Sequence, residues 1–486
     1  MKNVSELYSR KERPVKVLQI GEGNFLRAFV DYGIDVANEE LGFNSNVDII
    51  VPIANKPARF AKQNNIYTVC LRGQKDGKPY KENRVVTCVE QVLGAYEDYE
   101  AFMKLAELET LEFVVSNTTE AGIVYEDGDK LADKPPKTFP AKLTKFLYTR
   151  YQFFKGAPDK ALTMLPVELI DHNGENLKKC VLQYVALWQL EAGFKKWLDQ
   201  DCIFAGTLVD RIVPGYPRDE AAAICQELGY EDELLDKAEP FGLWVIGDAR
   251  VEKKFKVSSK KWHVIFTDKI EVYKERKVRI LNGAHTSMVL GAYLAGMDYV
   301  GQCMADPDIR TQLDQSVFGE IVPTVHLPKA EAEEFARAVF ERFENPFVKH
   351  ALLSISLNSI SKWKARVLPS FKDSVANNNG QLPKWLTYSL AALLAFYHTT
   401  KAGKGCLLGT RGADTYEIHD DADKLEFIRQ QAGKTNAGYV QAIMSRTDFW
   451  GEDLTKIPGF YDAVVKYLDA ILSKGARAVI QDLGKK

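Results

Sequence analysis

Residues 15–29 read VKVLQIGEGNFLRAF, and this stretch decides the fold. A short apolar run ends at Gly21, a second glycine follows at Gly23, and a helix-like pattern begins directly after it. A strand that turns into a helix through two glycines is typical of the first βα unit of a dinucleotide-binding sheet. The glycines permit a tight turn and let backbone N–H groups approach a pyrophosphate at the helix N-terminus.

The dinucleotide fingerprint is incomplete, because its third glycine would fall at position 26, where this chain has Leu26. A plain strand-to-helix turn is therefore the alternative interpretation. The place of the motif, directly after the first strand of an α/β region, favours a cofactor turn. Arg27 is placed either to help hold phosphate or to cap the fold. The candidate cofactor contacts in this turn are Gly21, Gly23, Asn24, Phe25 and Arg27.

Strand-like and helical segments alternate through the first half of the chain. Further apolar runs cover residues 46–54, 111–119, 202–210 and 242–248, and helical patterns cover residues 26–40 and 95–108. This alternation predicts βα units and a mainly parallel sheet with helices on both faces. After about residue 275 the apolar residues recur at helical spacing instead, over residues 285–297, 329–344, 383–400 and 458–483. We therefore predict a Rossmann-type domain over residues 1–275 and an all-α domain over residues 276–486.

Composition excludes several classes of protein. The 64 Lys and Arg residues nearly balance 66 Asp and Glu residues, so nothing in the charge favours nucleic acid or an anionic membrane. No apolar run approaches about 18 residues, and the N-terminus has no apolar core of a signal peptide. The seven cysteines are scattered without CxxC spacing, which fits a reducing cytoplasm and no metal site. His419 beside Asp420, Asp421 and Asp423 is interpreted as a solvated loop.

The run of residues 111–119 breaks at its carboxyl end into small polar residues, Ser116, Asn117 and Thr118. At the carboxyl end of a strand in a doubly wound sheet, such residues lie beside a dinucleotide. A hydrogen-bonded turn without a ligand is the alternative. The preceding strand ends at Asn55 and Lys56 rather than at the acid that usually binds the adenosine ribose. With Arg59 beyond, this ending leaves the choice between NAD and NADP open.

Residues 277–285 read KVRILNGAH and fall at the predicted domain junction. Hydride transfer between an alcohol and a ketone needs a base for the hydroxyl proton and donors for the oxyanion. Lys277 could supply the base, Asn282 an amide N–H and His285 a further contact. On an ideal α-helix these three lie loosely on one side, at about 0°, 140° and 80°. Taken singly, each is more often a solvated lysine, a turn asparagine or a structural histidine.

The spacing of Lys277, Asn282 and His285 resembles the K-x-x-x-x-N-x-x-H signature of the polyol-specific long-chain dehydrogenases, the mannitol dehydrogenase family. The resemblance extends over nearly the whole chain. It includes residues 21–29, 114–122, 208–214, 239–248 and 345–369. The stretches PVELIDHNG (166–174) and SISLNSISKWKARVLP (354–369) resemble in particular the branch that acts on sugar acids.

The resemblance implies Lys277 as general base, Asn282 as oxyanion holder and His285 as an assisting group. It also implies an NAD-dependent enzyme without metal, monomeric, that interconverts D-altronate and D-tagaturonate in hexuronate catabolism. Mannitol dehydrogenases carry a CDN-like triplet where this chain has Val167, Glu168 and Leu169. Asn173, just beyond, is our candidate for the family's upstream oxyanion asparagine.

A uronate substrate carries a carboxylate, so its pocket should offer a cation. Lys362, Lys364 and Arg366 alternate along SKWKAR and share one face if that stretch is extended. Lys362 and Arg366 are our candidate substrate contacts, and a solvated basic edge is the alternative. The competing functions are the same chemistry on mannitol or fructuronate, and a dinucleotide-binding sensor without turnover.

Overall fold

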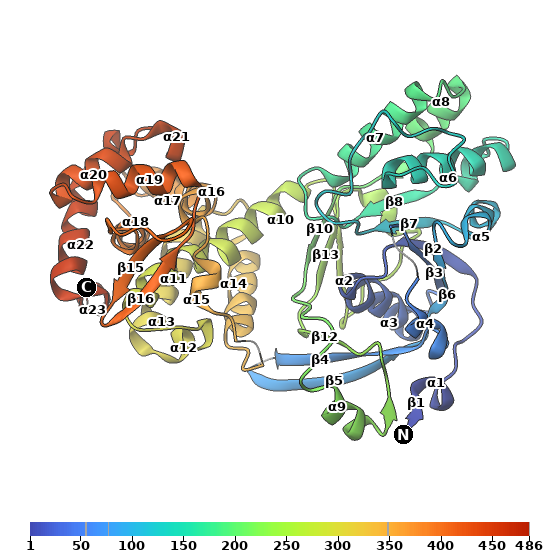
Figure 1. Ribbon diagram of the computed structural model, residues 1–486, viewed down its shortest axis with the longest axis horizontal. Coiled ribbons are helices and arrows are strands. Elements are labelled where there is room, and N and C mark those ends of the chain that lie inside the picture. The colour runs from blue at the N-terminus through green and yellow to red at the C-terminus, as the bar shows by residue number, and fades with distance from the viewer. Residues whose placement is uncertain (54–55, 76, 348, 486) are drawn as a thin grey trace. The chain divides into compact units, whose positions relative to one another are not determined.

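The computed structural model describes residues 1–53, 56–75, 77–347 and 349–485 (Figure 1). The chain forms two compact units. Unit 1 comprises residues 1–73 and 79–270, and unit 2 comprises residues 74–78 and 271–486. The main division lies between Ile270 and Glu271, five residues before the predicted boundary. The assignment of residues 74–78 to unit 2 was not anticipated.

Unit 1 is built on a six-stranded sheet with the order β6-β3-β2-β7-β8-β9, in which each described pairing is parallel. The strands are β2 (Val15–Ile20), β3 (Asn46–Val51), β6 (Val89–Gly94), β7 (Phe113–Ser116), β8 (Thr163–Pro166) and β9 (Ile203–Phe204). The predicted runs at residues 15–21, 46–54 and 111–119 supply β2, β3 and β7, which are the three central neighbours.

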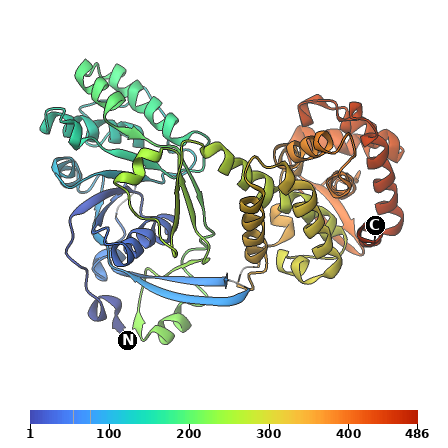
Figure 2. The ribbon, with the colours of Figure 1, turned by 180° about the vertical axis from the view of Figure 1, so that it is seen from behind.

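Alternate residues of the central strands enter two separate hydrophobic clusters. Val17 and Ile49 lie in one cluster with Phe29 of the glycine-turn helix, whereas Leu18 and Ile50 lie in the other. This alternation is the ordinary consequence of strand geometry, and burial on both faces explains why the strands are continuously apolar. Helices α6, α7 and α8 cover the second face (Figure 1), and the teal helices of the view from behind show the same layer (Figure 2).

The helices of unit 1 follow the predicted alternation, with one irregularity in the first of them. They are α1 (Val4–Leu7), α2 (Asn24–Leu26), the π-helix η1 (Arg27–Asp31), α3 (Tyr32–Glu40), α4 (Ala58–Lys62), α5 (Tyr99–Lys104), α6 (Phe139–Phe153), α7 (Asn173–Leu187), α8 (Ala192–Gln200) and α9 (Ala221–Leu228). Short 3₁₀ turns are η2 (Leu105–Glu107), η3 (Pro158–Lys160) and η4 (Ala249–Lys253). The single helix expected over residues 26–40 is therefore α2, η1 and α3 joined end to end.

Three smaller sheets complete unit 1. Their strands are β1 (Lys2–Asn3) with β11 (Tyr230–Glu231); β4 (Tyr67–Lys75), β5 (Lys78–Val86) and β12 (Asp236–Ala238); and β10 (Thr207–Asp210), β13 (Leu243–Ile246) and β14 (His263–Phe266). The run at residues 202–210 is thus two strands, β9 and β10, which belong to different sheets. The periodicity of apolar residues predicted neither the division of residues 202–210 into two strands nor the β4–β5 pair.

Unit 2 is rich in helices, and its central helix α18 (Lys384–Phe396) is buried from Trp385 to its end. The other helices are α10 (Ile270–Arg276), the π-helix η5 (Lys277–Asn282), α11 (Gly283–Leu294), α12 (Val300–Ala305), α13 (Pro307–Asp314), the π-helix η6 (Gln315–Ile321), η7 (Val322–Thr324), α14 (Lys329–Phe343), α15 (Leu352–Ile355), α16 (Ser359–Arg366), α17 (Leu368–Asn377), α19 (Ala422–Gln431), α20 (Asn436–Met444), α21 (Thr447–Trp450), η8 (Leu454–Lys456), α22 (Phe460–Lys474) and α23 (Ala476–Gly484).

Unit 2 is helix-rich, as predicted, and it also contains a hairpin that the prediction of an all-α domain did not include. Strands β15 (Leu407–Arg411) and β16 (Asp414–Ile418) form an antiparallel hairpin within it. The single helix expected over residues 458–483 is also two helices, because Gly475 has φ 85° and ends α22. None of the helices in the described part of the chain combines the length and the apolar character needed to cross a bilayer.

Candidate functional site

The glycine turn of unit 1 places an open helix N-terminus at the carboxyl end of β2. Gly21 has φ +119°, and an added Cβ there would lie 2.9 Å from Leu26 Cδ1 and 3.0 Å from Asn117 O. Gly23 is exposed, and no atom lies within 4 Å of a Cβ built on it. It caps α2 without a side-chain hydrogen bond. Gly23 and Asn24 are both exposed, so the start of this helix is accessible, which fits the phosphates of a dinucleotide.

Arg27 and Asn24 are engaged with the protein itself. The Arg27 guanidinium is buried, donates to Leu234 O at 2.6 Å and to Asn24 Oδ1 at 2.5 Å, and lies over the Tyr67 ring. It also lies 3.4 Å from Asp236 Oδ2. Of the two roles expected for Arg27, these contacts match capping of the fold. Phosphate binding by its side chain stays a prediction.

The loop after β7 is held by a carboxylate that the sequence did not single out as functional. Glu168 is buried at the end of β8, and it accepts hydrogen bonds from Thr118 N at 3.0 Å, Thr118 Oγ1 at 2.9 Å and Ser116 Oγ at 3.1 Å. Burial raises the pKa of Glu168 above its ordinary value. Ser116 and Thr118 therefore use their side chains to fix the loop, and Asn117 is left half-exposed at its tip. The departure of Glu168 from the family triplet was the signal that could have identified it.

Asn173 is also bound within the protein. Its amide nitrogen donates to Pro166 O at 3.0 Å and Glu168 O at 3.1 Å, and lies 3.2 Å from Thr207 O. Its Oδ1 accepts from the N–H groups of Gly174 and Thr207 at 2.9 Å. An amide has two donor hydrogens and two acceptor lone pairs, so this side chain is saturated. In this structure Asn173 connects the end of β8 to the start of β10 through hydrogen bonds. A direct contact of Asn173 with the substrate stays a prediction.

The signature segment of unit 2 is a π-helix and not the regular α-helix on which its geometry was predicted. Lys277 and Asn282 are the first and last residues of η5, and α11 continues from Gly283. A π-helix is closed by i to i+5 hydrogen bonds, so residues five apart lie one above the other. Lys277 and Asn282 therefore share a face more closely than the 140° of an ideal α-helix allows. Short π segments inside helices are frequent at functional sites.

The cations on either side of Lys277 are neutralised by acids. Arg276 lies 3.2 Å from Glu331, and Arg279 lies 3.0 Å from Glu275 and also pairs with Asp373. Lys277 and Asn282 are both half-exposed. These ion pairs fix the rotation of the π-helix about its axis, and thereby the direction in which Lys277 points.

His285 is shielded from solvent at Nε2, and this atom has no hydrogen-bond partner among the described residues. The ring stacks on Phe343 at 4.1 Å and meets His350 edge-on at 5.3 Å. Burial lowers the pKa of His285 well below 6.5, and the positive charges of His350, Arg342, Arg366 and Lys362 lower it further. The imidazole is therefore neutral at pH 7, with one ring nitrogen available to a bound molecule.

Lys362 and Arg366 lie on helix α16, so the condition of an extended SKWKAR is not met. Ile360 and Trp363 are fully buried at helical spacing, which turns this stretch into a helix. Lys362 and Arg366 still share a face, as residues i and i+4. Gly283 lets this helix approach the signature segment, since an added Cβ there would lie 3.1 Å from Arg366 O.

The two candidate substrate cations differ in their partners. Lys362 donates to Ile355 O at 2.8 Å, and burial lowers its pKa. Arg366 is half-buried, burial lowers its pKa, and it forms neither an ion pair nor a hydrogen bond with any described residue. A half-buried guanidinium without a counter-ion is costly unless an anion binds to it. His350 and Arg342 were missed by sequence reasoning, although His350 lies within the recognised stretch 345–369 and Arg342 lies just before it.

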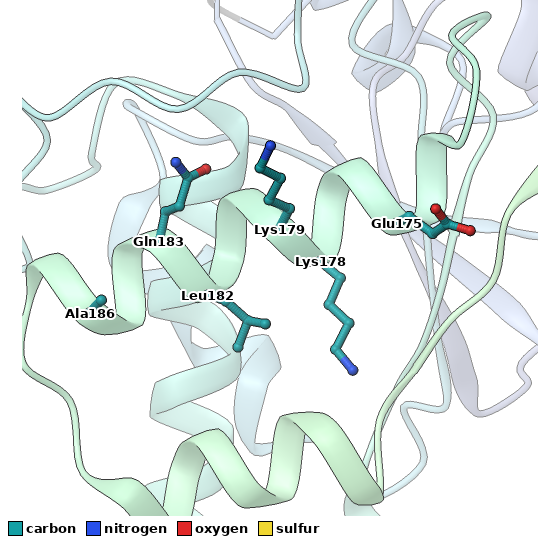
Figure 3. Close-up of a pocket in the computed structure, with 6 residues that line it drawn as sticks. All are labelled: Glu175, Lys178, Lys179, Leu182, Gln183 and Ala186. Atoms are coloured by element: carbon teal, nitrogen blue, oxygen red, sulfur yellow. The ribbon is translucent and has the colours of Figure 1, made fainter.

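An open groove on the outer face of α7 contains none of these predicted residues. It has a volume of about 490 Å³ and is lined by Glu175, Lys178, Lys179, Leu182, Gln183 and Ala186. Figure 3 shows that the six side chains project from a single helix in different directions. The groove therefore lacks the converging polar groups expected of an active site.

Most of the chain matches two domains of one enzyme family. Residues 15–259 match the mannitol dehydrogenase Rossmann domain, and residues 269–472 match the mannitol dehydrogenase C-terminal domain. The chain therefore belongs to the mannitol dehydrogenase family and is a polyol or sugar-acid dehydrogenase that acts on a CH–OH group.

Two bacterial relatives are similar over almost the full length. The chain is 44% identical over 479 residues to altronate oxidoreductase of Klebsiella pneumoniae (strain 342), and 43% identical over 479 residues to that of Escherichia coli O7:K1. Each comparison covers 97% of both chains. The resemblance predicted from the sequence is confirmed by these relatives and by the family matches.

Solved structures support the same fold. The Pseudomonas fluorescens mannitol 2-dehydrogenase, in a ternary complex with NAD and D-mannitol, has a TM-score of 0.66 at 22% identity, covering 99% of this chain and 96% of that one. A substrate-free D-sorbitol dehydrogenase has a TM-score of 0.77 at 19% identity, covering 99% of this chain and 100% of that one.

Proposed function

We propose that this protein interconverts D-altronate and D-tagaturonate with NAD as the hydride carrier, in the catabolism of hexuronates. The observation that carries the proposal is the set of positive groups around His285 in unit 2. Arg366 has no acidic partner among the described residues, and His285 Nε2 is buried without a hydrogen bond. A sugar acid supplies a partner for both groups, because its carboxylate can pair with the guanidinium and one of its hydroxyl groups can hydrogen-bond to the imidazole.

The chemistry rests on the π-helix. Lys277 accepts the proton of the substrate hydroxyl, and the Asn282 amide N–H donates to the oxygen as negative charge develops on it. The neutral imidazole of His285 binds a neighbouring oxygen and keeps the substrate aligned. A bound nicotinamide supplies the hydride acceptor. In the reducing direction the same groups return the proton to the oxygen.

Recognition of the acid group falls to Arg366, assisted by Lys362. A guanidinium can hold both oxygens of a carboxylate, whereas an ammonium acts as a point charge. The approach of α16 at Gly283 places these two cations on the helix that packs against the signature segment. A neutral polyol would leave the charge of Arg366 unpaired, which favours a sugar acid over mannitol.

The choice of NAD over NADP is supported by the surroundings of β3. Lys56 was a candidate for a 2′-phosphate, but its Nζ lies 2.7 Å from Asp98 Oδ2, which also accepts from Gly94 N at 2.9 Å. The Lys56 charge is thus already neutralised. Asn55, which was also considered at this strand end, lies outside the described residues, and Arg59 is exposed.

The test is a matrix of initial rates with purified protein, in which NADH or NADPH is combined with D-tagaturonate, D-fructuronate or D-fructose. We expect the fastest oxidation of NADH with D-tagaturonate. Preference for D-fructose would contradict the assignment of a carboxylate pocket, and preference for D-fructuronate would change the substrate but keep the pocket. Dinucleotide binding without turnover of any substrate would identify a sensor and overturn the enzymatic proposal.

A further inference from the structure

The β15–β16 hairpin of unit 2 brings three metal-binding side chains together. Within the described part of the chain, Cys406 Sγ, a carboxylate oxygen of Glu417 and a ring nitrogen of His419 lie within 4.8 Å of one another. They are the one such group of three among the described residues. We propose that this hairpin binds one Zn²⁺ or a similar borderline-soft divalent cation through Cys406, Glu417 and His419.

The register of the hairpin explains why these residues meet. Leu407 pairs with Ile418 and Leu408 pairs with Glu417. Extending the antiparallel register by one residue puts Cys406 opposite His419, and Glu417 lies two residues before His419 on the same face. Three side chains from two strand ends therefore point to one side of the hairpin, while Ile418 between them is buried in the core.

The backbone around the three side chains is fixed in place. Gly403 N donates to Cys406 O at 2.9 Å, and Leu408 N donates to Lys401 O at 2.9 Å, so the preceding loop folds back over the thiol. A Cβ at Gly403 would lie 2.7 Å from Cys406 Sγ, which means that this close approach requires glycine. On the other strand, Asn358 N donates to His419 O at 3.0 Å.

The chemistry of the three groups fits zinc. Thiolate, imidazole and carboxylate are its common ligands, at about 2.3, 2.0–2.1 and 2.0–2.2 Å, and atoms in a tetrahedral site lie roughly 3–4 Å apart. One thiolate and one carboxylate balance the two positive charges of the cation. The fourth position would hold water. His419 Nε2 already lies 2.9 Å from Glu417 Oε2, so only small side-chain rotations are needed to direct both at one ion.

The neighbouring acids are engaged elsewhere, which leaves these three groups as the ligand set. Asp420 is buried at its side chain, accepts from Tyr397 OH at 2.7 Å and lies 3.8 Å from Lys424 Nζ. Asp421 pairs with the same Lys424 at 2.5 Å. The interpretation of residues 419–423 as a solvated loop missed the cysteine, because Cys406 is 13 residues from His419 along the chain.

The test uses the reduced full-length protein after removal of metal with a chelator, titrated with Co²⁺ alone. We expect one equivalent to bind with the visible bands of tetrahedral cobalt and the near-ultraviolet band of a cobalt–thiolate bond, and Zn²⁺ to displace it. The Cys406→Ser variant should lose the thiolate band, and His419→Ala should lose or greatly weaken binding.

The matched control is His326→Ala, since His326 Nδ1 also lies 2.9 Å from a carboxylate oxygen, that of Glu275. This variant should keep the full cobalt spectrum. In a second measurement, Zn²⁺ should raise the unfolding temperature of the native protein but not that of Cys406→Ser. Absence of a thiolate band in the native protein, or its persistence in Cys406→Ser, would overturn the proposal regardless of how the variants fold.

Discussion

The two regions predicted to form the active site differ in whether their polar side chains are bound to other groups of the protein. In unit 1, Arg27, Asn173, Ser116 and Thr118 are bound to other protein groups, and the helix N-terminus at Gly23 is left open. In unit 2, the buried Nε2 of His285 and the guanidinium of Arg366 lack partners among the described residues. The first region thus offers backbone groups to its ligand, and the second offers side chains.

This difference follows from what each region must recognise. A dinucleotide is the same in many enzymes, and a helix N-terminus binds its phosphates through N–H groups that every sequence has. A sugar acid is distinguished from a polyol by one charged group, which a cationic side chain can pair with. Side-chain substitutions should therefore affect stability in unit 1 and chemistry in unit 2.

The largest effect is expected for Lys277→Ala. A positioned base contributes roughly 10²- to 10⁴-fold to the rate, so kcat should fall by that factor while the Kd of the dinucleotide is unchanged. Steady-state rates and calorimetric titration measure the two quantities. Lys274→Ala, on the preceding turn and paired with Glu271 at 3.0 Å, is the control and should retain activity. Equal kcat in both variants would remove the lysine mechanism.

A smaller, substrate-dependent effect is expected for Arg366→Ala. A hydrogen bond to a charged group contributes about 1.5–3 kcal/mol, so kcat/KM for the sugar acid should fall roughly 10- to 100-fold. Turnover of a neutral ketose should change far less. Lys364→Ala is the matched control, because Lys364 lies on the same helix on a different face. Equal losses with charged and neutral substrates would show that Arg366 supports the fold instead.

The glycine pair separates stability from binding within unit 1. Gly21→Ala places a side chain at φ +119° with contacts of 2.9 and 3.0 Å, which should cost about 1–3 kcal/mol of unfolding free energy. Gly23→Ala has φ −63° and open space around it. It should leave stability unchanged and weaken dinucleotide binding instead. Urea unfolding measures the stability of both variants, and calorimetric titration measures their affinity for the dinucleotide. A loss of stability in Gly23→Ala would contradict the interpretation that the helix N-terminus at Gly23 is open.

The smallest effects concern the pH dependence of stability, which should have opposite signs for Asp31 in unit 1 and His285 in unit 2. Burial raises the pKa of Asp31 in unit 1 to about 7, although Tyr67 and Gln19 donate to it. The folded state holds its proton more tightly than the unfolded state does, so this contribution to stability is present in acid and is lost as the pH rises through about 7. Asp31→Asn should flatten this dependence in urea unfolding at about pH 5 and about pH 8.

His285 in unit 2 behaves in the reverse sense. Its folded pKa lies well below the ordinary 6.5, so the unfolded state takes up the proton first. The contribution to stability is full above pH 6.5 and is lost as the pH falls from there toward the lowered pKa. His285→Gln should remove this loss below pH 6.5 and leave the Asp31 effect intact. A common pH slope in both variants would mean that neither group is the one titrating.

The architecture could be predicted from the sequence where a residue pattern is compatible with a single kind of secondary structure. Continuous apolar runs identified β2, β3 and β7, since burial on both faces requires them. Short strands such as β9 and β10 could not be separated, because strands of two and four residues are too short to show a periodicity. The alternation in SKWKAR was misleading, since the burial of Ile360 and Trp363 and not the charges decides its conformation.

For the candidate site, residue types were easier to predict than their surroundings. The signature spacing singled out Lys277, Asn282 and His285 as candidates, but the π-helix that brings Lys277 and Asn282 to one face leaves no mark in composition. The saturation of Asn173 depends on carbonyl groups from Pro166, Glu168 and Thr207, of which the last is 34 residues away. Such partners follow from the tertiary structure and not from local sequence.

The π-helix η5 also determines how this segment would respond to a deletion. A π turn is an α-helix that has accepted one additional residue, so removing a residue between Val278 and Leu281 would restore an ordinary helix without breaking it. The lysine and the asparagine would then lie four residues apart on an α-helix, about 40° apart around its axis, and would still share one face. The additional residue is thus absorbed where it stands, and a chain one residue shorter at this place would keep the candidate base beside the candidate oxyanion donor.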